Sequence, residues 1–462
     1  MAAIAVIGAG TAGLTAAFRL KRRGIRVVVY EAADRAGGVI LTERRDGYVA
    51  ELGPSSLAAP APAVQALLGE LGLQASVIAA SAEARHRYIA RKGKLMALPT
   101  SPPELLTTRL LSNTAKLAVF GEPLVDASDS PMEESVGAFV RRRFNQEVLD
   151  YVANPFIAGV FAGDPEQLSV RLALPKLAAL ERSHGSVIRA LAGMARAHRR
   201  EEDGAGAGEG LVSFRTGLQE LPEAFARELR SEIRLRSPVT QLRRGPKGWT
   251  VAAAFQPAEL YDGVVYAAPA HVIDDIDLEF DGGDRMKTLA SITHPPVGVL
   301  VLGFRREDVA HPLDGFGFLV PEVERRHVLG VIFSSTVFPG RAPEGHVTLT
   351  IFVGGVRNPD LAHADLPTIT ARAVHDLHAL LGVKGEATFR SFQLWPKAIP
   401  QYDLAYARYK DVMDEVERRN PRLALAGSYR EGVALGEVMI SGQEAASRLV
   451  EKLETDVAAD SR

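Results

Sequence analysis

Residues 4–31 of the chain read IAVIGAGTAGLTAAFRLKRRGIRVVVYE, and this stretch decides the fold. A strand-like run at 4–7 is followed by the turn Gly8-Ala-Gly-Thr-Ala-Gly13 and by a helix-like segment. In a Gly-x-Gly-x-x-Gly turn the first glycine permits the tight bend, the second lets the backbone approach a pyrophosphate, and the third lets the helix pack closely on the strand. The free N–H groups at the N-terminus of that helix favour negative charge. The stretch therefore predicts a dinucleotide-binding βαβ unit.

Glu31 supports the same interpretation. It lies 18 residues after Gly13, directly after a second strand-like run at 27–30. A carboxylate at that place can accept hydrogen bonds from both ribose hydroxyls of a dinucleotide. In a chain with 42 glycines the turn alone could match by chance. The prediction therefore depends on the strand, the helix and the acidic residue that surround it.

Composition excludes several classes of function. The 462 residues predict two or three domains, and 54 Lys and Arg against 56 Asp and Glu give a net charge of −2, so no overall field recruits nucleic acid. There is no cysteine, which excludes disulfides, thiolate metal sites and a cysteinyl link to a cofactor. Residues 1–18 carry no charge, but no basic segment precedes them and the glycine turn lies inside them, so a signal peptide is not expected. No other window holds about 18 uninterrupted apolar residues, so no membrane-spanning helix is expected.

The rest of the chain predicts further elements. Residues 38–42 predict a strand, and Asp46-Gly47 between apolar runs predicts a hairpin. The other expected elements are a helix at 62–72, two short strands in 85–99, helices from Pro102 to about residue 200, a Gly-rich loop at 203–210, paired strands at 233–235 and 238–242, a buried strand at 263–269, strands at 297–304, 328–333 and 347–353, and a helix at 367–381.

The residues after Glu31 distinguish flavin from nicotinamide cofactors. Residues 31–38, Glu-Ala-Ala-Asp-Arg-Ala-Gly-Gly, resemble the extended fingerprint of the flavin amine oxidase superfamily. In that superfamily the Arg and the two Gly residues continue around the bound FAD. The resemblance implies this role for Arg35, Gly37 and Gly38.

A second resemblance is more specific. Residues 154–171 contain Asn-Pro-Phe-Ile-Ala-Gly-Val-Phe-Ala-Gly-Asp and, further on, Gln-Leu-Ser-Val-Arg. They resemble the Gly-Val-Phe/Tyr-Ala-Gly-(Asp/Asn) and Leu-Ser signature of the oxygen-dependent protoporphyrinogen oxidases. Residues 315–321, 399–402 and 427–435 resemble the same family and follow in the expected order. The resemblance extends from residue 4 to residue 446.

The resemblance implies an α/β fold, with a Rossmann-type FAD-binding domain, an inserted mixed-sheet substrate domain and an inserted helical domain that faces a membrane. The implied FAD-binding segments are 1–84, 211–270 and 396–462. The implied substrate domain comprises the hairpin 85–100 and residues 271–395. The helical domain would span 101–205.

The resemblance also implies which residues hold a non-covalent FAD. Gly53, Pro54, Ser55 and Ser56 would lie against the isoalloxazine ring, although an ordinary turn explains their composition equally well. Val239 would lie near the adenine side. The complete implied set is Gly8, Gly10, Thr11, Ala12, Gly13, Glu31, Arg35, Gly37, Gly38, Gly53, Pro54, Ser55, Ser56, Val239, Ser428, Gly432, Val433, Ala434 and Leu435.

The family oxidises a porphyrinogen to the porphyrin in three two-electron steps, and oxygen then reoxidises the flavin and yields hydrogen peroxide. Because the cofactor carries the hydride chemistry, no catalytic side chain and no metal are expected. Arg87 matches a position that pairs with a substrate propionate, and Gly159 matches one whose backbone approaches the pyrrole N–H groups. Phe316, Leu319 and Phe352 match apolar positions that enclose the macrocycle. Without the resemblance, Arg87 would be read as part of a solvated basic face and the three apolar residues as plain core.

Three functions stay open at this point. The first is oxidation of protoporphyrinogen IX in haem biosynthesis, the second is oxidation of coproporphyrinogen III, and the third is a catalytically silent flavoprotein that binds porphyrin. Leucine-rich helices beside Arg109 and Lys116 suggest a cytoplasmic protein with peripheral membrane contact. Ferrochelatase and a second copy of the chain are further partners to consider.

The chain departs from the family pattern at three places. Thr216-Gly217 replaces the usual Gly-Gly, Gly436-Glu437-Val438 replaces Asn-Asp-Cys, and Ala405-Tyr406 replaces Gly-His. The implied FAD contacts near Gly432 are made by the backbone, so these changes concern the substrate more than the cofactor.

Overall fold

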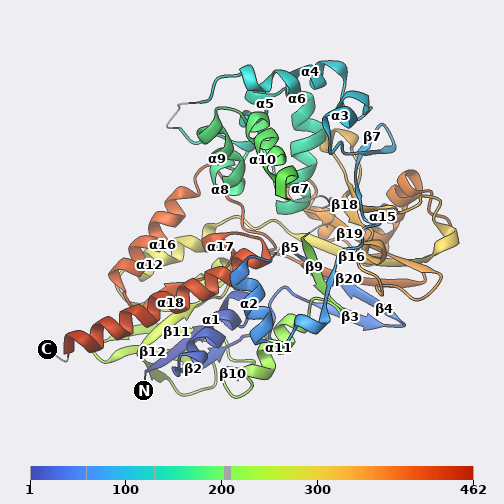
Figure 1. Cartoon of the computed structure of the whole chain (residues 1–462). Coiled ribbons are helices and arrows are strands. Elements are labelled where there is room, and N and C mark those ends of the chain that lie inside the picture. Colours follow the sequence, from blue (N-terminus) through green and yellow to red (C-terminus); the bar gives the residue numbers. More distant parts are fainter. Residues whose placement is uncertain (1, 59, 129–131, 202–209, 461–462) are drawn as a thin grey trace.

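A five-stranded parallel sheet lies at the lower left of Figure 1, in the computed structural model, which describes residues 2–58, 60–128, 132–201 and 210–460. β1 (Ala3–Ile7) lies between β2 (Arg26–Tyr30) and β14 (Gly263–Tyr266). β10 (Ile233–Arg234) and β21 (Leu423–Leu425) form the edges. The predicted βαβ unit is confirmed, because α1 (Thr11–Arg22) connects β1 to the parallel strand β2.

The two faces of the parallel sheet are covered by different structures. One face packs against α1, α2 (Pro62–Glu70), α11 (Glu220–Glu228) and α18 (Leu435–Asp460). The other face packs against a four-stranded sheet, whose strands are β11 (Val239–Gly245), β12 (Gly248–Ala253), β13 (Glu259–Tyr261) and β15 (Asp277–Glu279). Because both faces are buried, the parallel strands consist of continuous apolar runs.

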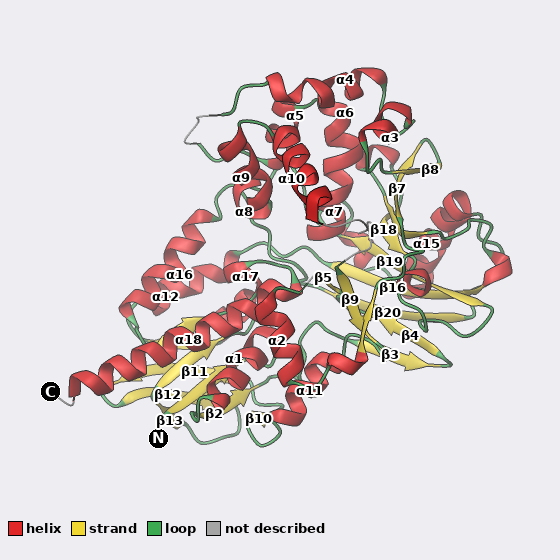
Figure 2. Ribbon diagram, viewed as in Figure 1, coloured by secondary structure: helices red, strands yellow, loops and turns green. Residues whose placement is uncertain are grey.

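A seven-stranded sheet forms the second layered unit, on the right of Figure 2. Its order is β20 (Phe389–Trp395), β16 (Val297–Arg305), β19 (His346–Gly354), β18 (Val328–Ile332), β17 (Gly315–Leu319), β7 (His86–Arg91) and β8 (Lys94–Ala97). α15 (Leu366–Leu381) covers one face, which buries Leu300, Leu349 and Phe318. The predicted strands and helix of this region are confirmed, and the predicted strands within 85–99 join the sheet at its edge.

Helices fill the segment from Pro102 to Glu201, at the top of Figure 1, as predicted. They are α3 (Pro102–Thr107), α4 (Asn113–Gly121), α5 (Val136–Arg143), α6 (Gln146–Val148), α7 (Asn154–Phe161), α8 (Val170–Ala173), α9 (Pro175–His184) and α10 (Val187–Glu201). One π-helical turn, Leu149–Ala153, directly precedes α7. Such turns are rare and occur frequently at functional sites. Within the described ranges, no helix is both long and apolar enough to cross a bilayer.

The predicted hairpin around Asp46-Gly47 is confirmed. β3 (Thr42–Arg45) pairs antiparallel with β4 (Tyr48–Glu51), and φ is 54° at Asp46 and 77° at Gly47. Positive φ at both central residues gives a turn that matches the twist of the strands.

The predicted strand at 38–42 is wrong, because the strand begins only at Thr42. Gly37 and Gly38 have φ of 112° and 56°, and these left-handed residues turn the chain before the strand begins. The Arg35 guanidinium also donates to the carbonyl oxygens of Gly38 and Ile40, at 2.6 and 2.9 Å. Residues 38–41 therefore form a loop.

The predicted pairing of 233–235 with 238–242 is also wrong. β10 pairs with β2 in the parallel sheet, whereas β11 pairs with β12 and β15 in the four-stranded sheet. Arg236, with φ of 53°, lies between the two strands, and the backbone N–H of Ser237 donates to the carbonyl of Glu31. The chain turns there from one sheet into the other. Most of the predicted Gly-rich loop, at 202–209, lies outside the described residues.

Candidate functional site

The glycine turn after β1 has the geometry that its spacing predicts. Gly8 has φ of 97°, and a Cβ there would lie 2.9 Å from Ala268. A Cβ on Gly13 would lie 2.0 Å from the carbonyl oxygen of Gly8, whereas a Cβ on Gly10 would meet no atom within 4 Å. The first and third glycines are thus required by the fold, and the second faces open space. α1 begins directly after it, at Thr11 and Ala12, so its free N–H groups point toward that space.

Glu31 lies against this turn. Its Oε2 accepts from the backbone N–H of Ala9 at 2.7 Å, and its Oε1 accepts from that of Ala33 at 2.8 Å. The carbonyl of Glu31 accepts from Ser237, two residues before Val239. Glu31 and Val239 are therefore near each other although they are 208 positions apart in the sequence.

Arg35, Gly37 and Gly38 form the loop that closes over the turn. The N–H of Gly37 donates to the carbonyl of Ala9 at 2.8 Å, and a Cβ on Gly38 would lie 3.2 Å from the Cα of Gly10. Because the Arg35 guanidinium is bound to carbonyls of its own loop, it supports the loop's shape.

The segment Gly53–Ser56 continues from the same loop. A Cβ on Gly53 would lie 2.0 Å from the carbonyl oxygen of Val39. Just before it, the carbonyl of Leu52 accepts from the indole Nε1 of Trp395 on β20, at 2.7 Å. This bond attaches the segment to the seven-stranded sheet.

Glu51, one residue earlier, is a buried carboxylate. It accepts from the Thr42 hydroxyl at 2.6 Å and from the Leu218 N–H at 2.8 Å, and it lies 3.4 Å from Arg341. Burial raises the pKa of the Glu51 carboxyl, and the buried Arg341 opposes that shift. The pair joins the hairpin β3–β4 to the loop before β19.

The C-terminal segment Ser428–Leu435 lies beside these loops. Gly432 has φ of 141°, and the N–H of Ala434 donates to Glu437 at 3.1 Å, where α18 begins. The side chain of Leu57, next to Ser56, is 3.7 Å from the place of a Cβ on Gly436. Val433 packs at the edge of the core formed with the parallel sheet. The structure thus brings all the predicted cofactor segments to one end of the parallel sheet.

The predicted substrate residues gather on one face of the seven-stranded sheet, which we call the substrate face. The Cζ of Arg87 lies 5.1 Å from the ring centre of Phe316, a cation–π arrangement. Desolvation lowers the pKa of Arg87, which nonetheless stays charged at neutral pH. Tyr88 and Phe318, their neighbours in sequence, pack on the opposite face with α15. Alternation along the strands therefore directs Arg87 and Leu319 to the substrate face.

One row of paired residues crosses this face. Leu319 pairs with Gly330, and Gly330 pairs with Phe352. Paired residues point to the same side of a sheet, so Leu319 and Phe352 flank a position without a side chain. Both are half-buried, unlike the buried residues under α15.

Gly159 of α7 meets the end of this row. A Cβ there would lie 2.5 Å from Leu319 Cδ2. The structure therefore brings Gly159, Leu319 and Phe352 together, with Phe316 and Arg87 further along the same face.

The sequence did not predict the hydrogen-bonded group that fixes α7 to the segment after β17. Asn154 Oδ1 accepts from the Glu322 N–H at 3.0 Å and from Arg357 Nη2 at 2.6 Å. Arg357 Nη1 donates to the carbonyl of Val320 at 2.6 Å. We call Asn154, Glu322 and Arg357 the α7 clamp. Asn154 within the 154–164 signature was a signal for it, whereas no sequence pattern pointed to Arg357.

Two further links join α7 to the cofactor segments. Gln401 Nε2 donates to the carbonyl of Phe161 at 2.8 Å, and the next residue, Tyr402, donates its hydroxyl proton to the carbonyl of Ser428. The predicted signatures at 154–164, 399–402 and 427–435 thus meet in space.

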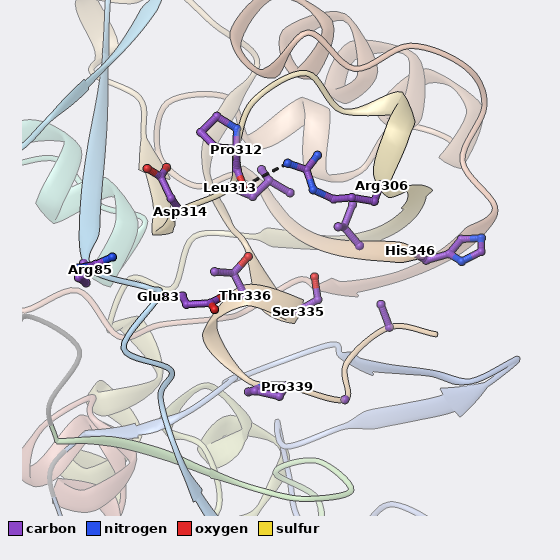
Figure 3. A pocket seen from close by; sticks show the side chains of 13 residues that line it. Glu83, Arg85, Arg306, Pro312, Leu313, Asp314, Ser335, Thr336, Pro339 and His346 are labelled. Atoms are coloured by element: carbon purple, nitrogen blue, oxygen red, sulfur yellow. Dashed lines mark hydrogen bonds between the residues drawn. The ribbon is translucent and has the colours of Figure 1, made fainter. Parts of the chain in front are cut away.

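A polar depression of about 610 Å³ lies at another part of the same sheet (Figure 3). Acidic and basic side chains both line it, among them Glu83, Arg85 and Asp314. None of its described lining residues is a predicted site residue. The described part of the chain also holds no group of three or more His, Asp or Glu side chains that could bind a metal ion.

Comparisons with known proteins agree with this arrangement. The family model of flavin containing amine oxidoreductases matches residues 11–450. Protoporphyrinogen oxidase 2 of Arabidopsis thaliana is 34% identical over 481 residues, which cover 98% of the chain and 94% of that protein. The coproporphyrinogen III oxidase of Staphylococcus aureus is 28% identical over 469 residues, which cover 97% of the chain and 99% of that protein.

A solved crystal structure of a protein from Exiguobacterium aligns with a TM-score of 0.82 at 23% identity. The alignment covers 97% of the chain and 99% of that structure. This likeness confirms the mixed α/β fold.

Proposed function

The chain belongs to the family of flavin containing amine oxidoreductases, and from this premise we propose that it oxidises a porphyrinogen to the aromatic porphyrin with non-covalent FAD. Molecular oxygen is the final acceptor and leaves as hydrogen peroxide. The observation that carries the proposal is the substrate face, where one arginine and three apolar side chains lie on one side of the seven-stranded sheet and Gly159 of α7 meets Leu319. Relatives named protoporphyrinogen oxidase support it over nearly the whole chain.

The residues present fit FAD. The open space above Gly10 and the N-terminus of α1 suit the pyrophosphate, and Glu31 suits the ribose hydroxyls. The backbone of Gly53–Ser56 and of Gly432–Leu435 would border the isoalloxazine ring. When bound, FAD accepts a hydride from the substrate in each two-electron step.

The link to FAD is proposed to be non-covalent, since the chain has no cysteine for a thioether. Attachment through a histidine is the other covalent route, and the next experiment distinguishes it. Acid precipitation of the purified holoprotein should release the yellow chromophore into the supernatant. Flavin that stays in the pellet would contradict the proposal.

The chain's own part in the reaction is to bind and orient the ring. Arg87 would pair with a propionate and so determine which edge of the ring enters. Phe316, Leu319 and Phe352 would remove the ring from water, and the backbone at Gly159 would lie near the pyrrole N–H groups. Three such steps remove six electrons in total, and each also releases one proton.

Anaerobic reduction of the flavin tests this function directly. The holoprotein is mixed with protoporphyrinogen IX or with coproporphyrinogen III without oxygen, and flavin absorbance is followed. We expect rapid bleaching with protoporphyrinogen IX. Bleaching with coproporphyrinogen III and not with protoporphyrinogen IX would identify coproporphyrinogen III as the substrate. The similarity to the coproporphyrinogen III oxidase of Staphylococcus aureus is the reason to test it. No bleaching with either would indicate a flavoprotein that only binds porphyrin.

Peripheral contact with a membrane is a separate proposal. Leu106, Leu117 and Leu124 are 62%, 72% and 88% exposed on neighbouring helical turns. Lys116 lies beside them, and exposed leucines next to cations favour an anionic lipid surface. Flotation with anionic liposomes should recover the protein in the lipid fraction, and Leu117→Asp with Leu124→Asp should abolish this. Wild-type protein that stays at the bottom of the gradient at low salt would contradict the contact.

A further inference from the structure

Residues 399–406 connect helix α7 with the C-terminal cofactor segment, and we call them the bridge. On the α7 side, the side chain of Gln401 donates to the carbonyl of Phe161 at 2.8 Å. The backbone N–H of Ser169 donates to the carbonyl of Tyr402 at 2.9 Å. The bridge is therefore fixed to the stretch of chain that begins with α7.

The other side of the bridge holds a short helix of the cofactor segment. This helix, α17 (Ser428–Glu431), has a single turn. The last four carbonyls of an α-helix have no partner inside the helix, so a helix of this length depends on partners from elsewhere. Two tyrosines of the bridge are such partners. Tyr402 donates its hydroxyl proton to the carbonyl of Ser428, and Tyr406 donates to the carbonyl of Tyr429 at 2.5 Å.

The two tyrosine hydroxyls are buried donors. Tyr402 is 7% and Tyr406 is 1% exposed. Burial raises the pKa of both hydroxyls, so both keep their protons throughout the neutral pH range. At Tyr402 a hydrogen bond from the backbone of Gly432 opposes this rise in pKa, so the hydroxyl also lies beside the end of α17. A buried carbonyl that loses its donor is costly, and the two bonds therefore fix the course of the chain through α17.

Tyr429 continues this connection to the glycine turn. Its side chain is buried, and its hydroxyl donates to the carbonyl of Tyr266 at 3.3 Å. Tyr266 is the last residue of β14, and two residues later Ala268 lies 2.9 Å from the place of a Cβ on Gly8. α17 is thus tied on one side to the bridge and on the other to the strand end beside the glycine turn.

On the basis of the proposed function, we propose that Tyr402 and Tyr406 are positioning residues for the flavin. Their hydroxyls hold α17 and Gly432 in the form that borders the isoalloxazine ring. Because the same bridge is fixed to α7, which meets the substrate face at Gly159, one segment sets the position of the flavin relative to the substrate.

This role explains one departure from the family pattern. The pattern has Gly-His where this chain has Ala405-Tyr406. Tyrosine carries its donor at the far end of the ring, further from the main chain than the ring nitrogens of histidine, and here that donor reaches α17. The departure at Tyr406 therefore concerns the cofactor, whereas the sequence alone linked it more to the substrate.

Flavin affinity distinguishes positioning from plain structural support. Tyr402→Phe and Tyr406→Phe each remove one hydroxyl and keep the ring. In the apoprotein α17 can relax and expose its carbonyl to water, whereas the flavin-bound form must keep that carbonyl buried without a donor. We therefore expect the flavin Kd to rise about 10-fold in each variant, measured by flavin titration of the apoprotein. The unfolding midpoint should accordingly fall further in the holoprotein than in the apoprotein.

Tyr409→Phe is the matched control. Tyr409 is buried in the same aromatic stack, with its ring centre 5.5 Å from that of Tyr406. Its hydroxyl is hydrogen-bonded to the Ser291 hydroxyl at 2.8 Å and accepts from Arg408 at 2.7 Å, so its partners lie outside the cofactor segments. Loss of this hydroxyl should change the stability of apoprotein and holoprotein equally and leave the flavin Kd at the wild-type value.

Kinetics at saturating FAD provide a second measurement. The substrate face is unchanged in Tyr402→Phe and Tyr406→Phe, so KM for protoporphyrinogen IX should stay within about twofold of the wild-type value. A flavin that shifts relative to α7 is less well aligned with the substrate, so kcat should fall about 3- to 10-fold.

The opposite results would overturn the inference. Equal loss of stability in apoprotein and holoprotein, with a wild-type flavin Kd and kcat, would make the hydroxyls purely structural. The proposed function would then still stand, because the wild-type holoprotein would oxidise a porphyrinogen. If one of the two variants does not fold, the other decides by the same criteria. A wild-type protein that binds no flavin, or that oxidises neither porphyrinogen, would refute the proposed function and the inference with it.

Discussion

The cofactor segments and the substrate face use the chain in different ways. Around the glycine turn the main chain makes the site, through positive φ at Gly8, the close approach of Gly13 to Gly8, and N–H groups at the start of α1. On the substrate face side chains make the site, from strands that come from residues 86–91, 315–319 and 346–354. Main-chain sites are specified by local spacing, whereas side-chain sites are specified by sheet register. The main-chain site around the glycine turn should lose flavin binding or stability when a side-chain atom is added. On the substrate face, each substitution should weaken substrate binding by the amount that the replaced side chain contributes.

The largest effect is expected at Gly13. In Gly13→Ala the new Cβ must displace the carbonyl of Gly8, which we expect to destabilise the protein by about 3 kcal/mol and abolish flavin binding. Gly10→Ala is the matched control, since its Cβ meets no atom. That variant should retain the thermal stability of the apoprotein yet lose flavin, because the methyl group occupies the place of the pyrophosphate. Equal stability loss in both variants would show that the two glycines do not differ as described.

Glu31→Ala should weaken flavin binding without unfolding the protein. The lost charge-assisted hydrogen bonds correspond to about 1.5 to 3 kcal/mol, or roughly a 10- to 100-fold rise in the flavin Kd. Flavin titration of the apoprotein measures this. Glu43→Ala, a substitution on β3 away from the turn, is the control. An unchanged flavin Kd in Glu31→Ala would show that Glu31 does not contribute to flavin binding.

Arg87 should show the side-chain character of the substrate face. Arg87→Ala should raise KM by about 10- to 100-fold through loss of a bidentate pair with a propionate. Lysine should rescue only part of this, since it supplies charge without the planar fork. Arg85→Ala changes an arginine that lines the polar depression instead, so its KM should equal that of the wild type. A wild-type KM in Arg87→Ala would show that Arg87 does not bind the substrate and is an ordinary solvated arginine.

The smallest of these effects is expected at the α7 clamp. Asn154→Ala removes the acceptor of two hydrogen bonds, which we expect to lower kcat about 3- to 10-fold by letting α7 shift on β17, at a net stability cost of about 1 to 3 kcal/mol. A positioning role predicts that kcat falls more than KM rises, and Gln146→Ala, an exposed helical position, serves as the control. If stability falls while kcat and KM stay unchanged, the clamp is structural only.

The same contrast explains which features the sequence predicted. Gly8, Gly13 and Glu31 could be placed from spacing alone because a βαβ unit fixes their backbone geometry locally. The turn at Asp46-Gly47 could be placed for the same reason.

Features that depend on non-local pairing could not be predicted in this way. The wrong pairing of 233–235 with 238–242 arose because nearness in sequence does not reveal that Ser237 is held by Glu31 and that the chain changes sheets there. The row Leu319–Gly330–Phe352 depends on the register of three strands, and β18 and β19 shift register between Val328 and Gly330. Arg357 is brought to Asn154 from 203 residues away, and only the folded chain shows it.

The strand order of the parallel sheet has a consequence for how the protein is made. β1 is completed early in synthesis, yet its neighbour β14 begins at Gly263 and the edge strand β21 at Leu423. At about 5 to 20 residues per second, the apolar strand at residues 3–7 waits roughly 13 to 50 seconds for β14, its second partner beside β2. During that interval one edge of β1 is unpaired and open to wrong association, so we expect nascent chains to depend on chaperones more than a protein with local pairing does. Ribosome-bound chains that stop before residue 263 should be cut readily by protease within residues 2–58, and chains that extend past residue 450 should resist. Early resistance in the short chains would show that α1 and β2 protect the strand by themselves.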